Sequence, residues 1–272
     1  MRTFSPKLIN FTDPHDPAAL ADMLQNYAFF KPRVERLRKE LAGVSNYKKH
    51  PAFLAVGRTV RVFVLQADGE SYAVRLLGTD HEQQHFRARL CGGSLVSDLP
   101  GLEKIIAASL EDGVTVSRLS PGRNISKLTN EDLSAISPEQ LNGFVDSLTQ
   151  AYRRGVLVDT SAGNLFYDRT LGFSIIDYIS VNGLSYGLGY LTAEVARQFR
   201  FDFERSVCGA PDAVITPAEL RNFFTLKINI LKTYAQAAGA KLPPKDFEIV
   251  KKAAAKILSA LKRAARRCGV RQ

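Results

Sequence analysis

Residues 155–178 read GVLVDTSAGNLFYDRTLGFSIIDY. It holds Asp159, then Asn164 five positions later, then Asp177 at the end of an apolar run. Phosphoryl transfer uses groups of these kinds, because one carboxylate accepts the proton of a hydroxyl while an amide oxygen and a second carboxylate hold Mg²⁺. The three residues are therefore candidates for one catalytic site, although Asp and Asn are also common in ordinary turns.

The spacing of these residues resembles that of the protein-kinase-like superfamily, which includes eukaryotic-type protein kinases and kinases of the aminoglycoside phosphotransferase group. Asp159 and Asn164 match the Asp and Asn of the catalytic-loop pattern H-R-D-x-x-x-x-N. Asp177 matches the metal-binding Asp of D-F-G, here with Ile before it and Tyr after it. The resemblance implies a two-lobed α+β fold, ATP and Mg²⁺ as cofactors, Asp159 as catalytic base, and Asn164 and Asp177 as metal ligands.

Upstream segments extend the resemblance over about residues 53–200. The run Tyr-Ala-Val-Arg that ends at Arg75 resembles the third-strand V-A-I-K motif, so Arg75 is expected to grip the phosphates. Gly57 aligns with one glycine of the Gly-rich loop. Residues 114–121 fall where the interlobe hinge belongs, which implies that the backbone at Ser117 and Leu119 meets adenine. As orienting partner of Arg75 we favour Glu82 over Glu103, which we place at the start of a strand.

Several positions depart from the kinase pattern. Arg75 stands where a Lys is expected, and its longer planar guanidinium need not seat on phosphates in the same way. Leu157 replaces the His of the catalytic loop, and Ala55 and Val60 occupy the places of two loop glycines. These departures keep open a nucleotide-binding pseudokinase without turnover. The sequence also leaves the phosphoryl acceptor undecided. The Ile-Asp-Tyr form at Asp177 favours a small-molecule hydroxyl, whereas a faint A-P-E-like segment at Glu194 favours a protein hydroxyl.

The pattern of apolar residues predicts the elements around these motifs. A helix is expected at 16–43, with Asp16 as N-cap, Pro17 at the first position and Pro32 as a kink or break. The other expected elements are strands at 53–65 and 71–77, a polar helix at 80–91, a hairpin at 104–119, a helix at 138–154, short strands at 156–158 and 173–176, and helices over about 190–268. The expected organisation is a helical extension at 1–50, an N-lobe at 51–119 and a C-lobe at 120–272.

A second motif points to a different reaction. Residues 81–85 read His-Glu-Gln-Gln-His, a literal H-E-x-x-H, in which His81 and His85 could bind Zn²⁺ while Glu82 activates water. The flanking residues are polar, and Ala88 and Cys91 stand where an extended metalloprotease pattern would have Gly and His. A zinc hydrolase therefore stays as an alternative beside the kinase hypothesis.

The net charge of +10 comes largely from the end of the chain. Residues 241–272 hold ten Lys and Arg against two acidic residues, so the remainder is nearly balanced. The pattern at 246–268 predicts an amphipathic helix, which could bind an acidic partner or lie on an anionic membrane, or could simply pack as a terminal helix. It lacks the aromatic residues that stack on bases, so a specific nucleic-acid partner is not expected.

Other features of the sequence concern the compartment. No apolar run approaches the roughly 20 residues that cross a bilayer, and the start lacks the apolar segment of a secretory signal. Three widely spaced cysteines do not form a disulfide framework and fit reduced thiols. We therefore expect a cytoplasmic protein, with a secreted effector delivered without a Sec signal as the alternative.

Overall fold

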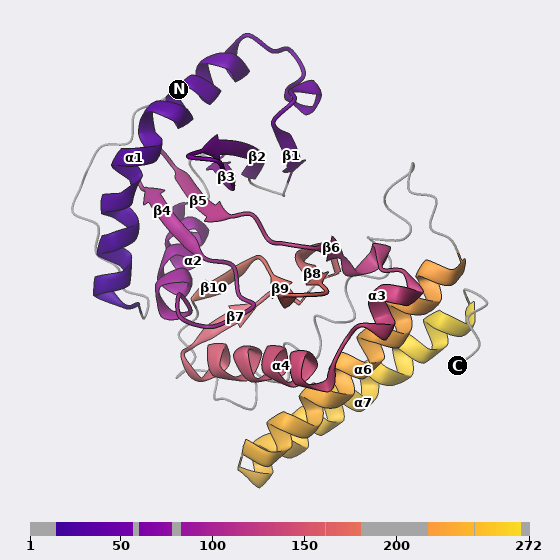
Figure 1. Ribbon diagram of the computed structural model, residues 1–272. Helices are drawn as coiled ribbons and strands as arrows, with labels where there is room; N and C mark the ends of the chain where they lie inside the picture. Colours follow the sequence, from indigo (N-terminus) through magenta and orange to yellow (C-terminus); the bar gives the residue numbers. More distant parts are fainter. Residues whose placement is uncertain are drawn as a thin grey trace. The chain divides into compact units, whose positions relative to one another are not determined.

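The computed structural model describes residues 15–56, 60–77, 83–160, 162–180, 217–241 and 243–267 (Figure 1). The chain is α+β, as expected, with a small antiparallel sheet and several helices. Its contacts divide it into two compact units. The N-terminal unit draws on Met1–Ser97, Glu103–Leu119 and Ile179–Val181, and the C-terminal unit on Asp98–Leu102, Ser120–Tyr178 and Asn182–Gln272.

The N-terminal unit is built on a five-stranded antiparallel sheet with the order β1-β2-β3-β5-β4. The strands are β1 (Phe53–Val56), β2 (Val60–Ala67), β3 (Glu70–Leu77), β4 (Ile105–Ser109) and β5 (Val114–Arg118). Asp68 and Gly69 both have positive φ, 52° and 82°, as a tight two-residue hairpin requires. The β2–β3 and β4–β5 hairpins expected from the sequence are confirmed, whereas the expected strand at 53–65 is divided into β1 and β2, which pair antiparallel.

Helix α1 (Pro17–Ala42) belongs to the core of this unit. The carboxylate of Asp16 caps it by accepting from the backbone N–H of Ala18 and Ala19, and the helix continues through Pro32 without a break. Its apolar side packs on the sheet in one buried cluster that includes Phe30 and Val34 from the helix and Phe63 from β2. The sequence pattern set residues 1–50 apart, whereas α1 supplies part of the core.

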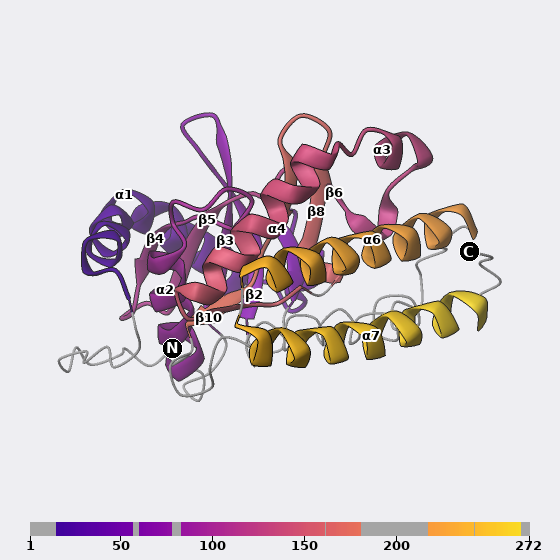
Figure 2. The ribbon, with the colours of Figure 1, turned by 90° about the horizontal axis from the view of Figure 1, so that it is seen from below.

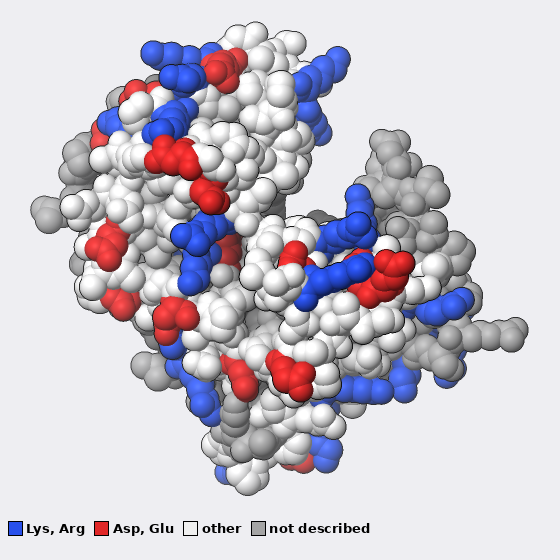
Figure 3. Space-filling view, in the orientation of Figure 1, with Lys and Arg blue, Asp and Glu red and all other residues white. Residues whose placement is uncertain are grey.

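Two further contacts tie the helices to this sheet unit. Helix α2 (Gln83–Leu95) is joined to the start of α1, because the backbone N–H of Asp16 donates to the Ser94 hydroxyl at 2.9 Å. Near the other end of α1, Arg38 forms an ion pair with Asp112 at the β4–β5 turn, 3.4 Å from Nη1 to Oδ1. On the face seen in Figure 3, acidic and basic side chains are mixed over this unit.

The C-terminal unit combines small sheets with helices. It contains β6 (Arg123–Asn124), α3 (Asn130–Ser134), α4 (Pro138–Arg153), β7 (Val156–Val158), β8 (Leu165–Asp168), β9 (Gly172–Ile175), α6 (Pro217–Lys241) and α7 (Pro244–Arg267). Strands β6, β8 and β9 form one sheet of this unit. Strand β7 pairs with β10 (Tyr178–Ser180), of which Tyr178 belongs to this unit. Helix α4 begins with a reciprocal capping box between Ser137 and Gln140, which confirms the expected start.

Helices α6 and α7 pack side by side (Figures 1 and 2). Of the six apolar positions expected to form one face of the last helix, Leu258 is only half-buried, and the other five are each no more than 2% exposed: Val250, Ala254, Ile257, Leu261 and Ala265. The final helix is therefore a packed element of its unit. In the described parts of the chain, none of the helices is long and apolar enough to cross a membrane.

Candidate functional site

Backbone hydrogen bonds bring the three candidate residues of the C-terminal unit together. Asp159 follows β7, Asn164 ends a 3₁₀ turn at Ala162–Asn164, and Asp177 lies between β9 and β10. The N–H of Asp159 donates to the carbonyl oxygen of Asp177 at 2.9 Å, and Asn164 Nδ2 donates to the carbonyl oxygen of Asp159 at 3.4 Å. The N–H of Ile176 donates to the carbonyl oxygen of Asn164 at 2.9 Å. Residues spaced along eighteen positions of sequence thus converge on one half-buried cluster.

Asp177 has an unusual backbone conformation. Its φ is +76°, in the left-handed region that residues with a Cβ seldom occupy. Asp is one of the few side chains found there, yet the conformation still costs free energy, and such outliers concentrate at functional sites. The conformation fixes the backbone of Asp177 at the bend between β9 and β10, beside Asp159.

The donor atoms of this cluster suit a hard cation. The three side chains carry two carboxylates and an amide, and Mg²⁺ prefers oxygen ligands of these kinds. Because Asn164 donates through Nδ2, its Oδ1 atom is the part of the amide that can ligate a metal. Within the described ranges, no group of three or more His, Cys, Asp or Glu is placed to hold a metal. A magnesium site made of Asn164, Asp177 and phosphate oxygens contains one residue of these four types, so it is not a group of that kind.

A polar clamp holds the β8–β9 hairpin, which begins just after Asn164 and ends just before Asp177. Asp132 of α3 is buried and accepts from Arg169 Nε, at the β8–β9 turn, at 2.7 Å, and from Arg123 Nη1 at 3.3 Å. It also accepts from the backbone N–H of Thr129 at 3.0 Å. Burial alone would raise the pKa of Asp132, but the Thr129 N–H and the Arg169 guanidinium outweigh it and lower the pKa to about 2. An ionised Asp132 thus fastens the β8–β9 hairpin to α3.

In the N-terminal unit, Arg75 lies on β3 and pairs with Glu103, whereas the favoured Glu82 lies outside the described residues. Arg75 Nη2 donates to both carboxylate oxygens of Glu103, at 3.0 and 3.2 Å. Arg89 from α2 also donates to Glu103 Oε2. Burial alone would raise the pKa of Glu103, but Arg75 and Arg89 outweigh it and lower the pKa to about 2. The preference for Glu82 rested on its closeness in sequence, whereas the fold brings Glu103 to β3 from 28 positions away.

The two expected hinge residues lie in different settings. Ser117 is fully buried on β5, a strand flanked by β3 and β4. Leu119 lies just beyond β5, is 38% exposed, and donates its N–H to the carbonyl oxygen of Ser71 at 3.4 Å. Contact of either backbone with adenine stays a prediction.

Four other residues named from the sequence lie outside the described ranges: Gly57, His81, Glu82 and Glu194. His85 is described and is exposed on α2. The zinc alternative therefore stays a prediction. Conversely, the sequence interpretation did not single out Arg89, whose position in the middle of a polar helix gave no local sign of an ion pair with Glu103.

Comparison with known proteins does not supply a family. No protein-family model matches the sequence, and no curated protein matches it. The functional hypothesis for this chain therefore depends on its own residues and their geometry.

Proposed function

We propose that the protein is an ATP- and Mg²⁺-dependent phosphotransferase with a kinase-like, two-lobed arrangement, which moves the γ-phosphoryl group to a hydroxyl of a protein or a small molecule. The observation that carries this proposal is the convergence of Asp159, Asn164 and Asp177 through hydrogen bonds to backbone carbonyl oxygens. A chance set of turn residues would not need to meet, whereas an oxygen-rich phosphotransfer site must bring a base and metal ligands together.

Each residue of the cluster has a separate role in the proposed reaction. Asp159 accepts the proton of the acceptor hydroxyl while the oxygen of that hydroxyl forms a bond to the γ-phosphorus. At the same time the bond between the γ-phosphorus and the leaving ADP oxygen breaks. Asn164 and Asp177 hold the magnesium through their side-chain oxygens, and the left-handed backbone of Asp177 fixes the position of its carboxylate stem. Bound magnesium would offset the negative charge of the phosphates.

Arg75 is proposed as the phosphate clamp and Glu103 as its orienting partner, in place of Glu82. Two hydrogen bonds from Nη2 to Glu103 restrict the Arg75 side chain. A side chain that is already ordered loses less conformational entropy when it binds a phosphate. Arg89 holds the other side of Glu103 and thus acts through it as a positioning residue.

The test is binding of Mg·ATP, followed by phosphotransfer to a panel of protein and small-molecule acceptors. We expect Asp159→Asn to lower the transfer rate by at least about a hundredfold while ATP still binds, because only the base is lost. Asp177→Asn should weaken magnesium-dependent ATP binding. Asp168→Asn is the matched control, since Asp168 lies between Asn164 and Asp177 in the sequence, at the end of β8, but accepts from the N–H groups of its own turn, at 2.8 and 2.9 Å. Absence of ATP binding, or equal loss in the control, would contradict the proposal.

A nucleotide-binding pseudokinase is the second candidate. It is favoured by the engagement of Arg75, whose Nη2 atom is already shared by both oxygens of Glu103. In that case the protein would bind ATP with an affinity that depends on Asp177. Phosphotransfer would be absent from the parent protein and from Asp159→Asn alike, because no turnover occurs. The same binding and transfer measurements separate the two candidates.

A further inference from the structure

The exposed side of α7 carries one sign of charge almost throughout. Its exposed cations are Lys245, Lys251, Lys252, Lys256, Lys262, Arg263 and Arg266. At 3.6 residues per turn, these seven positions fall within one arc of about 140°. The exposed carboxylate in this arc, Glu248, lies 3.5 Å from Lys251 Nζ. We call these seven residues the cationic face of α7.

The apolar side of α7 is committed to the fold. Val250, Ala254, Ile257, Leu261 and Ala265 lie on the other side of the helix from the cationic face and are buried, with α6 packed alongside (Figure 2). An amphipathic helix that lies on a membrane normally inserts its apolar side between the lipids. That mode would require α7 to leave its unit, so the helix can act on a partner only through its charges.

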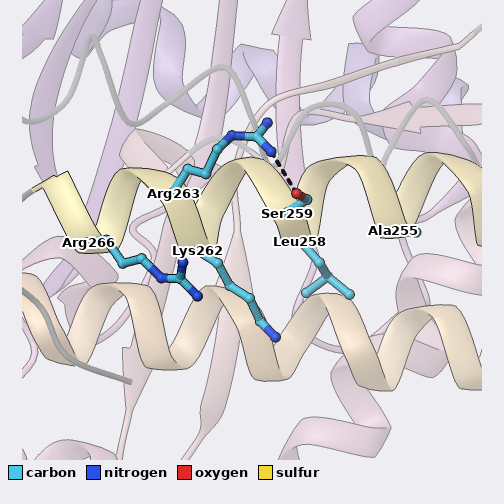
Figure 4. Close-up of a pocket in the computed structure, with 6 residues that line it drawn as sticks. All are labelled: Ala255, Leu258, Ser259, Lys262, Arg263 and Arg266. Carbon is cyan, nitrogen blue, oxygen red and sulfur yellow. Dashed lines mark hydrogen bonds between the residues drawn. The ribbon is translucent and has the colours of Figure 1, made fainter.

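The cationic face has a hollow near its C-terminal end. A hollow of about 400 Å³ is lined by Ala255, Leu258, Ser259, Lys262, Arg263 and Arg266 (Figure 4). Lys262 and Arg266 lie one turn apart and extend to the same side of the helix, whereas Arg263 turns the other way and donates to the Ser259 hydroxyl at 2.7 Å. The hollow therefore gathers cationic donors of the kind that bind phosphate oxygens.

We propose that the cationic face docks the protein on an anionic phospholipid surface, by charge and without insertion, and that the hollow receives a phosphate-bearing headgroup. Three observations favour a lipid surface. The cations lie on one straight side of a helix, over about 32 Å from residue 245 to residue 266, so a plane can meet them together. Five of the seven are Lys, which act as point charges, whereas Arg dominates in bidentate recognition. The aromatic residue of α7, Phe247, is partly buried and is not on this face, so base stacking is not supported.

The test measures binding of the full chain to vesicles. We expect binding to mixed phosphatidylserine–phosphatidylcholine vesicles, none to phosphatidylcholine alone, and a steep loss as salt is raised. Each cation near such a surface contributes about a fivefold change in partitioning, so Lys262→Ala with Arg266→Ala should lower binding about 30-fold. Lys31→Ala with Lys39→Ala on α1 removes the same charge from exposed positions elsewhere and should change binding by less than about threefold. Equal losses in the two double variants, or no binding at low salt, would overturn the proposal.

Two further arms identify the partner class and the binding mode. Duplex DNA or an acidic peptide that binds more tightly than the anionic vesicles would overturn the lipid assignment. The chain has no Trp, so Ile249→Trp, at a position 42% exposed beside the cationic face, supplies a single fluorescent probe. We expect vesicle binding with little change in its emission, whereas a large blue shift would show insertion and overturn the charge-only mode. Phosphotransfer is not measured in either arm, so the outcome is independent of the proposed function.

Discussion

Replacement of Glu103 by Gln tests the buried ion-pair cluster in the N-terminal unit. Gln has nearly the shape of a protonated Glu, so the variant mimics the fold with its central carboxylate neutralised. Arg75 and Arg89 would then face an amide that cannot balance their charge. Removal of one partner from a buried ion pair is strongly destabilising, because the remaining charge stays buried.

The expected magnitude follows from the pKa of Glu103, which falls from 4.5 to about 2 in the folded protein. Each pKa unit corresponds to about 1.36 kcal/mol, so ionised Glu103 contributes roughly 3 kcal/mol to the free energy of unfolding. Since the folded pKa is the lower one, this contribution is complete above about pH 4.5 and is lost as the pH falls toward 2. Glu103→Gln should therefore cost roughly 3 kcal/mol at pH 7, and about half of that near pH 3.

Urea titrations of both proteins at several pH values, followed by circular dichroism, measure this difference. Other carboxylates titrate equally in both proteins, so the difference isolates Glu103. The matched control is Glu70→Gln, an exposed carboxylate at the β2–β3 hairpin of the same unit, which should change stability by less than about 0.5 kcal/mol. The reasoning is refuted by a Glu103→Gln protein as stable as the parent at pH 7, or by a difference that does not change down to pH 3.

Three more predictions concern stability, and urea titration checks each of them. Gly122→Ala should lower the free energy of unfolding by several kcal/mol more than Gly69→Ala does. Both glycines have φ near +80°, but only the new Cβ at Gly122 would lie 2.2 Å from a carbonyl oxygen of β8. Equal losses in the two variants would contradict the steric argument. Phe30→Ala should cost about 3–5 kcal/mol because its ring is buried in the core, whereas Phe29→Ala, 44% exposed, should cost less than about 1 kcal/mol. A small effect at Phe30 would show that α1 is not part of the core. Ser137→Ala should cost about 1 kcal/mol through loss of the α4 cap, and Ser137→Asp should retain most of the stability.

Elements marked by local signals could be predicted from the sequence. Asp16 with Pro17, and Ser137 with Pro138, are cap and first-turn residues, and both helices begin there. The Asp68-Gly69 hairpin turn is equally local in origin. Helix α3 was missed because it is only five residues long, although Thr129 and Asp132 carry the capping-box pattern that would have marked it.

Features that depend on distant contacts could not be predicted in the same way. The sequence predicts no strand at Leu165–Asp168, where β8 lies, because four residues give too little alternation to distinguish a strand from a turn. The partner of Arg75 was assigned by sequence distance, but pairing between β3, β5 and β4 brings Glu103 into reach. The cluster of Asp159, Asn164 and Asp177 was expected only from a motif, and its backbone hydrogen bonds connect segments whose approach no local pattern encodes.

The interleaving of the two units has a consequence for the order in which the protein can fold during synthesis. Residues Asp98–Leu102 belong to the C-terminal unit, and the N–H of Ile175 donates to the carbonyl oxygen of Gly101 at 2.8 Å. When Leu119 leaves the ribosome, α1, α2 and the five strands of the first sheet have all been made, so the central core of that unit can already form. The short segment at 98–102 must then wait for more than fifty further residues before β9 arrives to pair with it. Slower translation between Leu119 and Ile175 would therefore prolong the time during which the nascent chain exposes this segment to chaperones and proteases.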